Sequence, residues 1–583
     1  MTNLIAAYSK YLLVLLILCY AILTLMYLLR HSKEARSRIS GIQRAFLFLL
    51  HITGFLVLFV QTKDLTLIAL WAGQTAFFIA YMLLWGRFYP RSSRLITNNI
   101  CALLAIAFII QARLSAGNAV RQFIYVVIAG AVSLFIPFLM RWVLSLGPKA
   151  ALIVGFAGLA ALLLVLAAGG WSNGAKLNLT SIGIPVQPSE FVKISICFFI
   201  AGMLAEKTSF RRAAFTTIIV AANILVLVVS RDLGSALIFF VSYLLVLFIA
   251  TQRAVYPLTG LGLGAAASVL AYRLFSHVRT RVQVWRDPWE DPTGSGYQVL
   301  QALFAVGTAG WFGMGLYEGA AGMIPLASSD FVFAAIAEEL GGVFALCLIL
   351  ICFENTIQIL WLSSALRNAF DKLLVSGLGI FYGVQIFINV GGVLKIIPST
   401  GVTLPFVSSG GSSILASFIS FAVIQACFVR SDEREEYERV RLMEPDDQVM
   451  FFRGGKFSGY DQEPGYCDDE YRDMPEEYED PDGYYDGPEA YEAADGYSDG
   501  PEEYDAADEY YDGPEEYDAA DEYSDGPEEY DAADGYYDGP EEYEDPPRRR
   551  WSTMNGMEDE DRGGYSDLLG KVRDDDELEH SGF

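Results

Sequence analysis

The chain has 583 residues, a formal net charge of −28 at pH 7 and a mean hydropathy of +0.33. A single soluble domain is excluded, because an acidic soluble protein has a negative mean hydropathy and because this length exceeds one hydrophobic core. The charge is unevenly divided: residues 431–583 hold 55 of the 69 acidic side chains and a net charge of −43, whereas residues 1–430 carry +15. The sequence therefore predicts a basic membrane body followed by an acidic tail.

The body contains long uncharged apolar runs, each about long enough to cross a hydrocarbon layer of roughly 30 Å as a helix. The clean runs are 11–29, 45–62, 65–86, 95–112, 122–140, 150–175, 213–230, 233–252, 254–272 and 373–394. Three further spans, near 190–205, 329–353 and 404–430, contain charges or prolines. The expected fold class is an all-α polytopic membrane protein with about thirteen transmembrane helices.

Basic side chains in the short loops orient these spans, because Lys and Arg accumulate on the cytoplasmic side of a membrane. The 30–44 loop holds five of them. If successive spans cross the membrane in alternating directions, all the remaining basic short loops lie on the same side as this loop. The N-terminus is therefore expected outside and the acidic tail in the cytoplasm. The segments expected outside are 169–188, 231–232, 273–328 and 395–403.

No metal site or disulfide framework is predicted. The chain has seven cysteines and four histidines, and their spacing matches neither pattern. Six of the cysteines lie in apolar runs, where a free thiol packs as a small hydrophobe.

The long external segment 273–328 has an unusual charge pattern. It includes RTRVQVWRDPWEDPTGSGYQ, in which three arginines stand outside, against the usual bias, beside three acidic residues. A carboxylate among arginines at the membrane surface suits chemistry on an anionic lipid head group. The alternative is a surface salt-bridge cluster next to an interfacial aromatic belt.

Charged residues also interrupt one expected span. The sequence QPSEFVKIS places Glu190 and Lys193 on one face of a helix that begins near Pro188. An ionisable residue inside a span costs roughly 2.5–3.5 kcal/mol on insertion scales, so such a pair usually faces a cavity. The alternative is an acid at the helix start and a lysine that reaches the interface.

Other charged positions have competing interpretations. Arg231 and Asp232 precede LGSALIFF, and they either join the polar site or form a short outer turn in which Asp232 caps the next helix. Asp330 has the same two interpretations, a part of the polar site or simply a cap of the helix that follows it. Glu338 and Glu339 lie deeper, and at least one of them is expected to point into the bundle.

The last span begins IIPSTGVTLPFVSSGGSSILASF. Its prolines, paired glycines and hydroxyls predict irregular backbone at membrane depth, which is tolerated where it lines a buried or water-filled cavity. Together with Glu190 and Lys193, this pattern predicts a polar cavity open to the outside. Close helix packing through small residues is the alternative.

Several motifs follow one another along about 95–430: NGAKLNL and QPSEFVK, RDLGSA, RDPWEDPTGSGYQ, SDFVFAAIAEELG, and QIFINVGGVLKIIPSTGVTLPFVSSGGSS. Together they resemble the FtsW/RodA/SpoVE family, the SEDS proteins of bacterial cell-wall synthesis. Two motifs depart from the usual family form, with RDLGSA in place of PDLGTA and SSGGSS in place of SYGGSS. The family core has ten spans, so residues 1–90 are extra, 91–430 form the core, and 431–583 form the tail.

The resemblance implies a peptidoglycan glycosyltransferase of the bacterial plasma membrane that polymerises lipid II. It implies a class B penicillin-binding protein and other cell-wall synthesis machinery as partners, in division, elongation or sporulation, and no nucleic acid. It does not fix a cofactor. The candidate is a divalent cation, either magnesium or manganese.

The family's essential external aspartate falls on Asp291, and its acid–lysine pair falls on Glu190 and Lys193. The implied substrate-binding positions are these two residues with Arg231, Asp232, Arg281, Gln298, Ser408, Ser409, Ser412 and Ser413. Our hypothesis is that Asp291 is the general base of an inverting glycosyl transfer, with Arg281 and Lys193 stabilising the pyrophosphate leaving group. The alternatives are a lipid II flippase and a non-catalytic scaffold for a penicillin-binding protein.

The tail has its own pattern. From Pro475 a 13-residue unit such as PEEYDAADEYYDG recurs through 547. High charge, Gly–Pro breaks and the absence of aliphatic residues larger than alanine predict a disordered segment. It is either a solvating tail or a tyrosine-rich docking segment.

Overall fold

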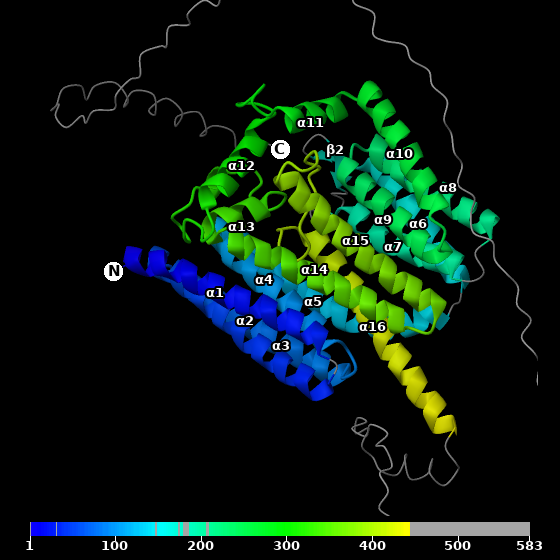
Figure 1. Ribbon diagram of the computed structural model, residues 1–583, viewed down its shortest axis with the longest axis horizontal. Helices are drawn as coiled ribbons and strands as arrows, with labels where there is room; N and C mark the ends of the chain where they lie inside the picture. Colours follow the sequence, from blue (N-terminus) through cyan, green and yellow to red (C-terminus); the bar gives the residue numbers. More distant parts are fainter. Residues whose placement is uncertain are drawn as a thin grey trace, which may run out of the picture. The chain divides into compact units, whose positions relative to one another are not determined.

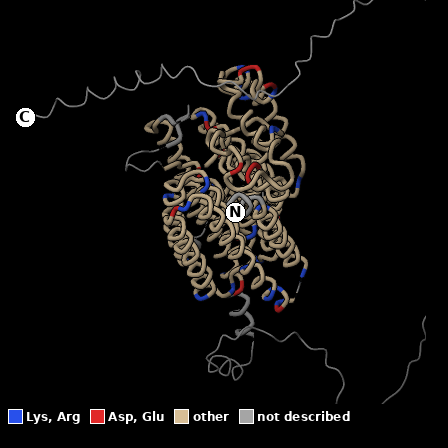
Figure 2. Tube along the Cα trace, turned by 90° about the vertical axis from the view of Figure 1, so that its left-hand side faces the viewer, with Lys and Arg blue, Asp and Glu red and all other residues tan. Residues whose placement is uncertain are grey.

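The structure is a computed structural model that describes residues 2–30, 32–145, 148–172, 175–178, 186–205 and 209–442. The expected disordered tail repeats, 475–547, lie outside the described residues. The described chain is almost wholly helical and contains one short antiparallel hairpin, β1 (Gly170–Ser172) with β2 (Ala175–Asn178). Long stretches of the described helices carry no charged residue, and many of the charged residues lie near helix ends (Figure 2).

Twelve helices of the described residues are long and apolar enough to cross a membrane. Three of them precede the motifs and lie side by side (Figure 1): α1 (Thr2–Leu29), α2 (Lys33–Thr62) and α3 (Thr66–Phe88). The other nine are α4 (Arg94–Leu114), α5 (Ala116–Ser145), α6 (Pro148–Ala168), α8 (Phe210–Val229), α9 (Leu233–Thr251), α10 (Val255–Leu274), α14 (Gly342–Ala365), α15 (Ala369–Val393) and α16 (Gly411–Leu442). The thirteenth expected span is α7 (Pro188–Leu204), which has 17 residues and carries Glu190 and Lys193.

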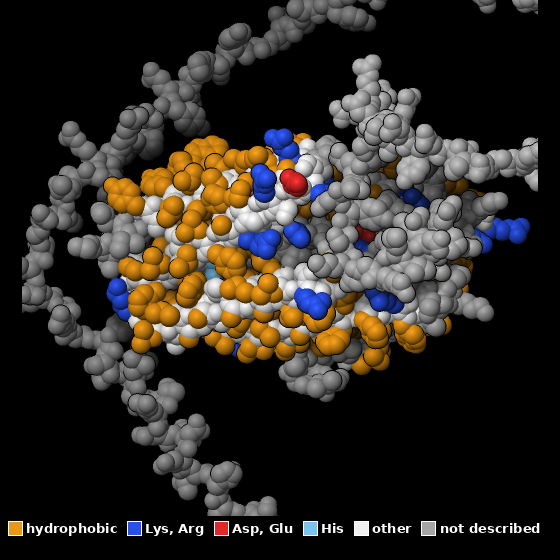
Figure 3. Space-filling view, turned by 90° about the horizontal axis from the view of Figure 1, so that it is seen from below, with side chains coloured by type: hydrophobic (Ala, Val, Ile, Leu, Met, Phe, Trp, Pro, Cys, Tyr) orange, Lys and Arg blue, Asp and Glu red, His pale blue; other side chains and the backbone are white. Residues whose placement is uncertain are grey.

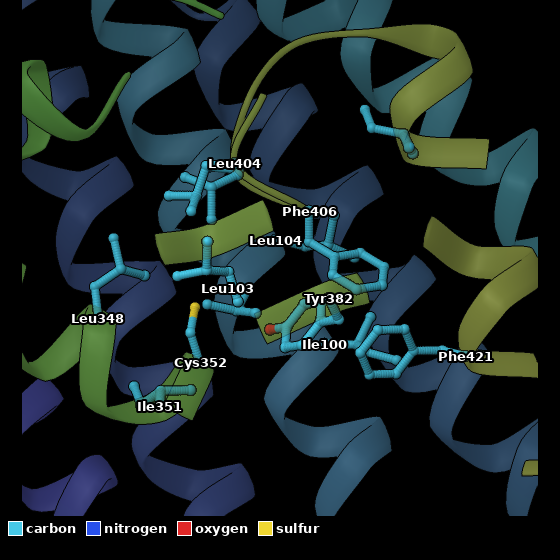
Figure 4. Packing of buried hydrophobic residues seen from close by; sticks show 14 of the residues in the cluster. Ile100, Leu103, Leu104, Leu348, Ile351, Cys352, Tyr382, Leu404, Phe406 and Phe421 are labelled. Atoms are coloured by element: carbon cyan, nitrogen blue, oxygen red, sulfur yellow. The ribbon is translucent and has the colours of Figure 1, made fainter. Parts of the chain in front are cut away.

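Helix α4 forms the centre of the bundle. Every residue from 95 to 112 is buried, because α4 packs against α2, α5 and α14. Ile100, Leu103 and Leu104 of α4 lie near Leu348, Ile351 and Cys352 of α14, and Tyr382 of α15 and Phe406 complete this part of the core (Figure 4). At the other extreme, α10 has no buried residue. Hydrophobic side chains cover much of the described surface in Figure 3, as expected of helices that face lipid.

Three expected spans have different boundaries in the structure. The span expected at 150–175 ends as a helix at Ala168, and Gly170–Ser172 forms β1. The span expected at 329–353 is divided at Gly341 into the short α13 (Val332–Leu340) and the long α14, so the membrane-crossing helix runs to Ala365. Gly341 has φ of +94°, and a Cβ there would collide with backbone atoms of residues 311–313. The span expected at 404–430 begins as a helix only at Gly411, and the irregular backbone predicted before it is confirmed.

The segment 273–328 is ordered around two helices, α11 (Ser276–Arg286) and α12 (Tyr297–Ala309). Its later part, 310–315, runs alongside the break at Gly341. The N–H groups of Met314 and Gly315 donate to the carbonyls of Glu338 and Glu339, and those of residues 342 and 343 donate back to residues 310 and 311. Glu338 and Glu339 both point into the bundle as expected, and their carboxylates accept from the N–H groups of residues 320 and 317.

Candidate functional site

A polar cavity of about 460 Å³ opens where α11, α12 and the 395–413 segment meet the first residues of α7 and α9. The polar cavity predicted from the last span is therefore present. Its lining includes seven of the eleven candidate site residues: Arg231, Asp232, Arg281, Gln298, Ser409, Ser412 and Ser413.

The start of α9 supplies Asp232 to the cavity. Its Oδ1 accepts from the N–H of Ser235 at 3.0 Å, so the predicted helix cap is confirmed. Its Oδ2 accepts from the hydroxyl of Ser189 at 3.1 Å, which ties α9 to the start of α7. Burial raises the pKa of Asp232, and the bonds from these two serines oppose that shift. The two interpretations of Asp232 are compatible, because a capping carboxylate also lines the cavity.

Glu190 and Lys193 form a buried ion pair that does not line the cavity, and the side chain of Gln385 lies between the pair and the cavity lining. Lys193 Nζ lies 2.6 Å from Glu190 Oε2 and 2.6 Å from Gln385 Oε1. Gln385 Nε2 donates to the carbonyl of Thr403 at 2.9 Å, and Thr403 lines the cavity. The pair therefore reaches the cavity through Gln385 and the 395–413 segment.

The serines of the last motif have different positions. Ser412 Oγ accepts from the N–H of Gln187 at 3.0 Å, and Ser413 shares a 2.8 Å hydrogen bond with Thr403, so both face the cavity lining. Ser408 is 1% exposed. Its hydroxyl donates to the carbonyl of Ser329 at 2.6 Å and accepts from the N–H of Leu404. Ser408 thus holds the loop and does not face the cavity.

Asp291 lies at the exposed turn between α11 and α12, outside the cavity lining. Its two oxygens accept from the N–H groups of Gly294, at 3.0 Å, and Ser295, at 2.7 Å. These bonds hold the pKa of the carboxyl below its usual range. Ser295, from the turn that Asp291 organises, and Gln298, from the start of α12, do line the cavity.

Helix α11 brings Arg281 to the cavity, whose lining also holds the carboxylates of Asp232 and Asp330. Its guanidinium donates to the carbonyl of Ser399 at 3.0 Å. Burial lowers the pKa of Arg281, and the charges of Asp232 and Asp330 oppose that shift. Next to it, Trp285 Nε1 donates to the carbonyl of Lys395 at 3.1 Å, so α11 is fastened along the 395–401 loop.

The sequence interpretation missed two charged residues of the lining, Asp330 and Lys395. A cap of α13 was one of the two interpretations of Asp330, but the N-cap position is Phe331 and no side chain caps that helix. Local sequence could not separate the two roles, because Gly401 and Arg281, which lie near Asp330, come from distant segments. Arg231 and Lys395 also have positive φ, of 64° and 59°. Residues other than glycine rarely adopt this backbone conformation, and such residues concentrate at functional sites.

The donor set of this cavity does not fit a resident divalent cation. No group of three or more His, Cys, Asp or Glu side chains that could hold a metal lies together in the described part of the chain. The two carboxylates of the lining, Asp232 and Asp330, lie within reach of the charge of Arg281 instead. Three cationic side chains against two acidic ones suit an anionic ligand better than a metal ion.

Fold and site together define a multi-pass membrane protein with a polar cavity at one end of its helix bundle. Residues 93–432 match the family model of FtsW/RodA/SpoVE, described as cell cycle protein. The chain belongs to this family, and the resemblance carried by the motifs is confirmed. The helices α1–α3 precede the matched residues.

Curated relatives carry the names of several branches of the family. The peptidoglycan glycosyltransferase RodA of Mycobacterium tuberculosis is 40% identical over 272 residues, which are 43% of this chain and 57% of the relative. Stage V sporulation protein E of Bacillus subtilis is 32% identical over 318 residues, which are 52% of this chain and 85% of the relative. The chain thus spans little more than half the length of the mycobacterial relatives that it matches.

One solved structure supports the same fold. Its title describes structural coordination of polymerization and crosslinking by a peptidoglycan synthase complex. It has a TM-score of 0.50 and 25% identity, and the match covers 58% of this chain and 98% of that chain.

Proposed function

We propose that the protein is a peptidoglycan glycosyltransferase that polymerises lipid II in the bacterial plasma membrane. The observation that carries this proposal is the cavity, which gathers Arg281, Arg231 and Lys395 beside carboxylates and hydroxyls. Guanidinium and ammonium groups bind a pyrophosphate, whereas hydroxyls and carboxylates bind sugars. Family membership and the names of the relatives support the same activity.

The reaction joins two lipid-linked saccharides. The 4-hydroxyl of the acceptor GlcNAc attacks the anomeric carbon of the growing chain, and the bond from that carbon to the pyrophosphate oxygen breaks. The electron pair leaves with undecaprenyl pyrophosphate, and the configuration at the carbon inverts. Pyrophosphate needs little help from an acid, so the protein's main tasks are to take one proton and to stabilise negative charge.

Asp291 is the general base in this proposal. In the present conformation both of its oxygens accept backbone N–H groups, so the turn at 291–295 has to loosen before the carboxylate meets the acceptor hydroxyl. A general base works best with a pKa near the operating pH. Loss of the two N–H bonds would raise the pKa of Asp291 towards that range.

The remaining site residues bind and orient the substrate. Arg281 and Lys193 stabilise the leaving pyrophosphate, and Glu190 holds Lys193 in place at 2.6 Å. Asp232, Gln298 and the serines 409, 412 and 413 bind sugar or phosphate groups in the cavity. A class B penicillin-binding protein would crosslink the product. In this proposal the cavity opens to the outside of the membrane and the acidic tail lies in the cytoplasm.

The test is polymerisation of labelled lipid II by the purified protein, alone and with its penicillin-binding protein. Wild type should make long glycan strands on a gel, and Asp291→Ala should make none although it folds. Glu290→Gln is the matched control, because Glu290 is an exposed acid next to Asp291. No polymer from wild type in the partner's presence would favour a flippase or a scaffold, and polymer from Asp291→Ala would remove Asp291 as the base.

A further inference from the structure

Asp330 belongs to a short segment whose backbone is held on several sides. The carbonyl of Ser328 accepts from Gln111 of α4 at 2.7 Å and from the N–H of Ser409 at 2.8 Å. The carbonyl of Ser329 accepts from Ser408. The carbonyl of Asp330 itself accepts from Asn389 Nδ2 of α15 at 3.0 Å. The backbone of 328–330 is therefore fixed by the core, and Ser329 and Asp330 of this segment line the cavity.

The loop opposite leaves room for this carboxylate. Gly401 has φ of +73°, and a Cβ at that position would lie 3.3 Å from Asp330 Oδ2. A larger residue there would be strained and would crowd the carboxylate. The placement of Asp330 thus depends on two segments that are distant in sequence, and both are built around it.

The charged groups facing Asp330 come from every side of the cavity. Arg281 of α11 lies close enough for its charge to act on Asp330, and Arg231, Asp232 and Lys395 share the lining. Burial raises the pKa of Asp330, while the hydroxyl of Ser329 and the charge of Arg281 lower it. Its environment is the opposite of that of Asp291, which is exposed and bound to N–H groups. Two carboxylates in contrasting environments are the usual basis for two different roles in one reaction.

We propose that Asp330 is a second catalytic carboxylate, which faces the anomeric carbon of the donor sugar inside the cavity and stabilises the positive charge that develops there. This inference rests on the proposed function. The anomeric carbon is bonded directly to the pyrophosphate, so a pyrophosphate held by Arg281 brings that carbon next to Asp330. As the bond to the pyrophosphate breaks, the electron pair leaves with the phosphate and the acceptor proton passes to Asp291. Asp330 gains neither a proton nor a bond, and its contribution is electrostatic.

The alternative is a structural role, in which Asp330 only balances the positive charge of Arg281. The test compares Asp330→Asn with wild type and with Glu290→Gln in the lipid II assay, with the penicillin-binding protein present. We expect kcat to fall about 100-fold or more for Asp330→Asn, with KM changed less than about threefold and thermal stability retained. Glu290→Gln should stay within about twofold of wild type. A KM increase with unchanged kcat, or unchanged kinetics, would overturn the assignment.

If Asp330→Asn does not fold, Asp330→Glu keeps the charge and moves it by one methylene. We then expect a loss confined to kcat, and full activity would count against the proposal.

A pH profile gives a readout that a purely structural role would not move. Because Asp330 must be ionised, kcat should fall as the pH drops through its raised pKa. Arg281→Gln removes a charge that lowers this pKa, so the acid limb of its residual activity should shift to higher pH. An acid limb of the Arg281→Gln profile that stays at the wild-type pH or moves to lower pH would overturn the role of Asp330. Wild type that makes no polymer would overturn the proposed function and this inference together, whereas an active wild type with an equally active Asp330→Asn would overturn only this inference.

Discussion

Two regions of the described chain hold buried polar side chains that are used differently. One region is the seam where α1 and α2 meet α4. There Asn98 Nδ2 lies 3.0–3.2 Å from the hydroxyl and carbonyl oxygens of Ser40 and from Gln43 Oε1, and Gln43 in turn donates to Thr24. The other region is the cavity, where hydroxyls and charged groups face open space.

The difference lies in the backbone and not in the types of residue. The seam joins continuous helices, so backbone groups are satisfied within each helix and the side chains bond to one another across the interface. The cavity is built from helix starts, a tight turn and the irregular 395–410 segment, in which Lys395 of the lining has a left-handed backbone conformation. Buried polar residues between regular helices stabilise packing, whereas those beside irregular backbone are candidates for function.

The largest effect is expected from breaking the ion pair in the core. Lys193→Met leaves Glu190 as a buried carboxylate without its partner, so we expect a loss of about 3–5 kcal/mol in the free energy of unfolding. Polymer formation should fall at least about 100-fold. Thermal unfolding and the lipid II assay measure the two effects.

A double variant separates the two causes. Glu190→Gln with Lys193→Met removes both charges, so stability should return to within about 1–2 kcal/mol of wild type. Activity should stay lost, because Lys193 is proposed to stabilise the leaving group. A stable double variant that polymerises lipid II would show that the pair serves only the fold.

A smaller effect is expected at the seam. Asn98→Leu leaves Ser40 and Gln43 without their donor, and hydrogen bonds inside membrane proteins contribute about 0.6 kcal/mol on average and at most about 1.7. We therefore expect unfolding to become easier by about 1–2 kcal/mol, with the polymerisation rate per folded molecule unchanged. Ile42→Ala, at an exposed apolar position of α2, is the control for stability. A selective loss of turnover in Asn98→Leu would mean that the seam also serves catalysis.

Features that depend on local sequence could be predicted. Ten apolar runs became helices, Asp232 caps α9, and the prolines and glycines before Gly411 gave irregular backbone. The break at Gly341 could not be predicted, because it depends on hydrogen bonds with 310–315, about 25–30 residues earlier in the chain. Asp330 was misjudged for the same reason: its neighbours Gly401 and Arg281 come from distant segments. Local patterns predicted the elements and much of the lining, whereas long-range contacts decided which carboxylate faces inward.

The smallest effect is expected where α1 touches the 310–315 segment. Lys10 Nζ donates to the carbonyl of Gly313 at 3.0 Å, and the ring of Tyr11 lies 5.2 Å from that of Phe312. The same segment is already held by four backbone hydrogen bonds to residues 338–343, so the contact from α1 adds little. Lys10→Met should therefore change the free energy of unfolding by less than about 1 kcal/mol.

Hydrogen exchange in 310–320 should nevertheless rise slightly, while exchange in 395–403 and the polymerisation rate stay the same. Arg113→Met is the instructive comparison, because Arg113 lies 2.8 Å from buried Glu339 and 4.2 Å from the ring of Tyr317. That variant should loosen 310–320 far more than Lys10→Met does, since it leaves a buried carboxylate without its partner. If Lys10→Met instead abolished polymerisation without unfolding the protein, α1 would be a positioning element of the site and not only a packing partner of α14.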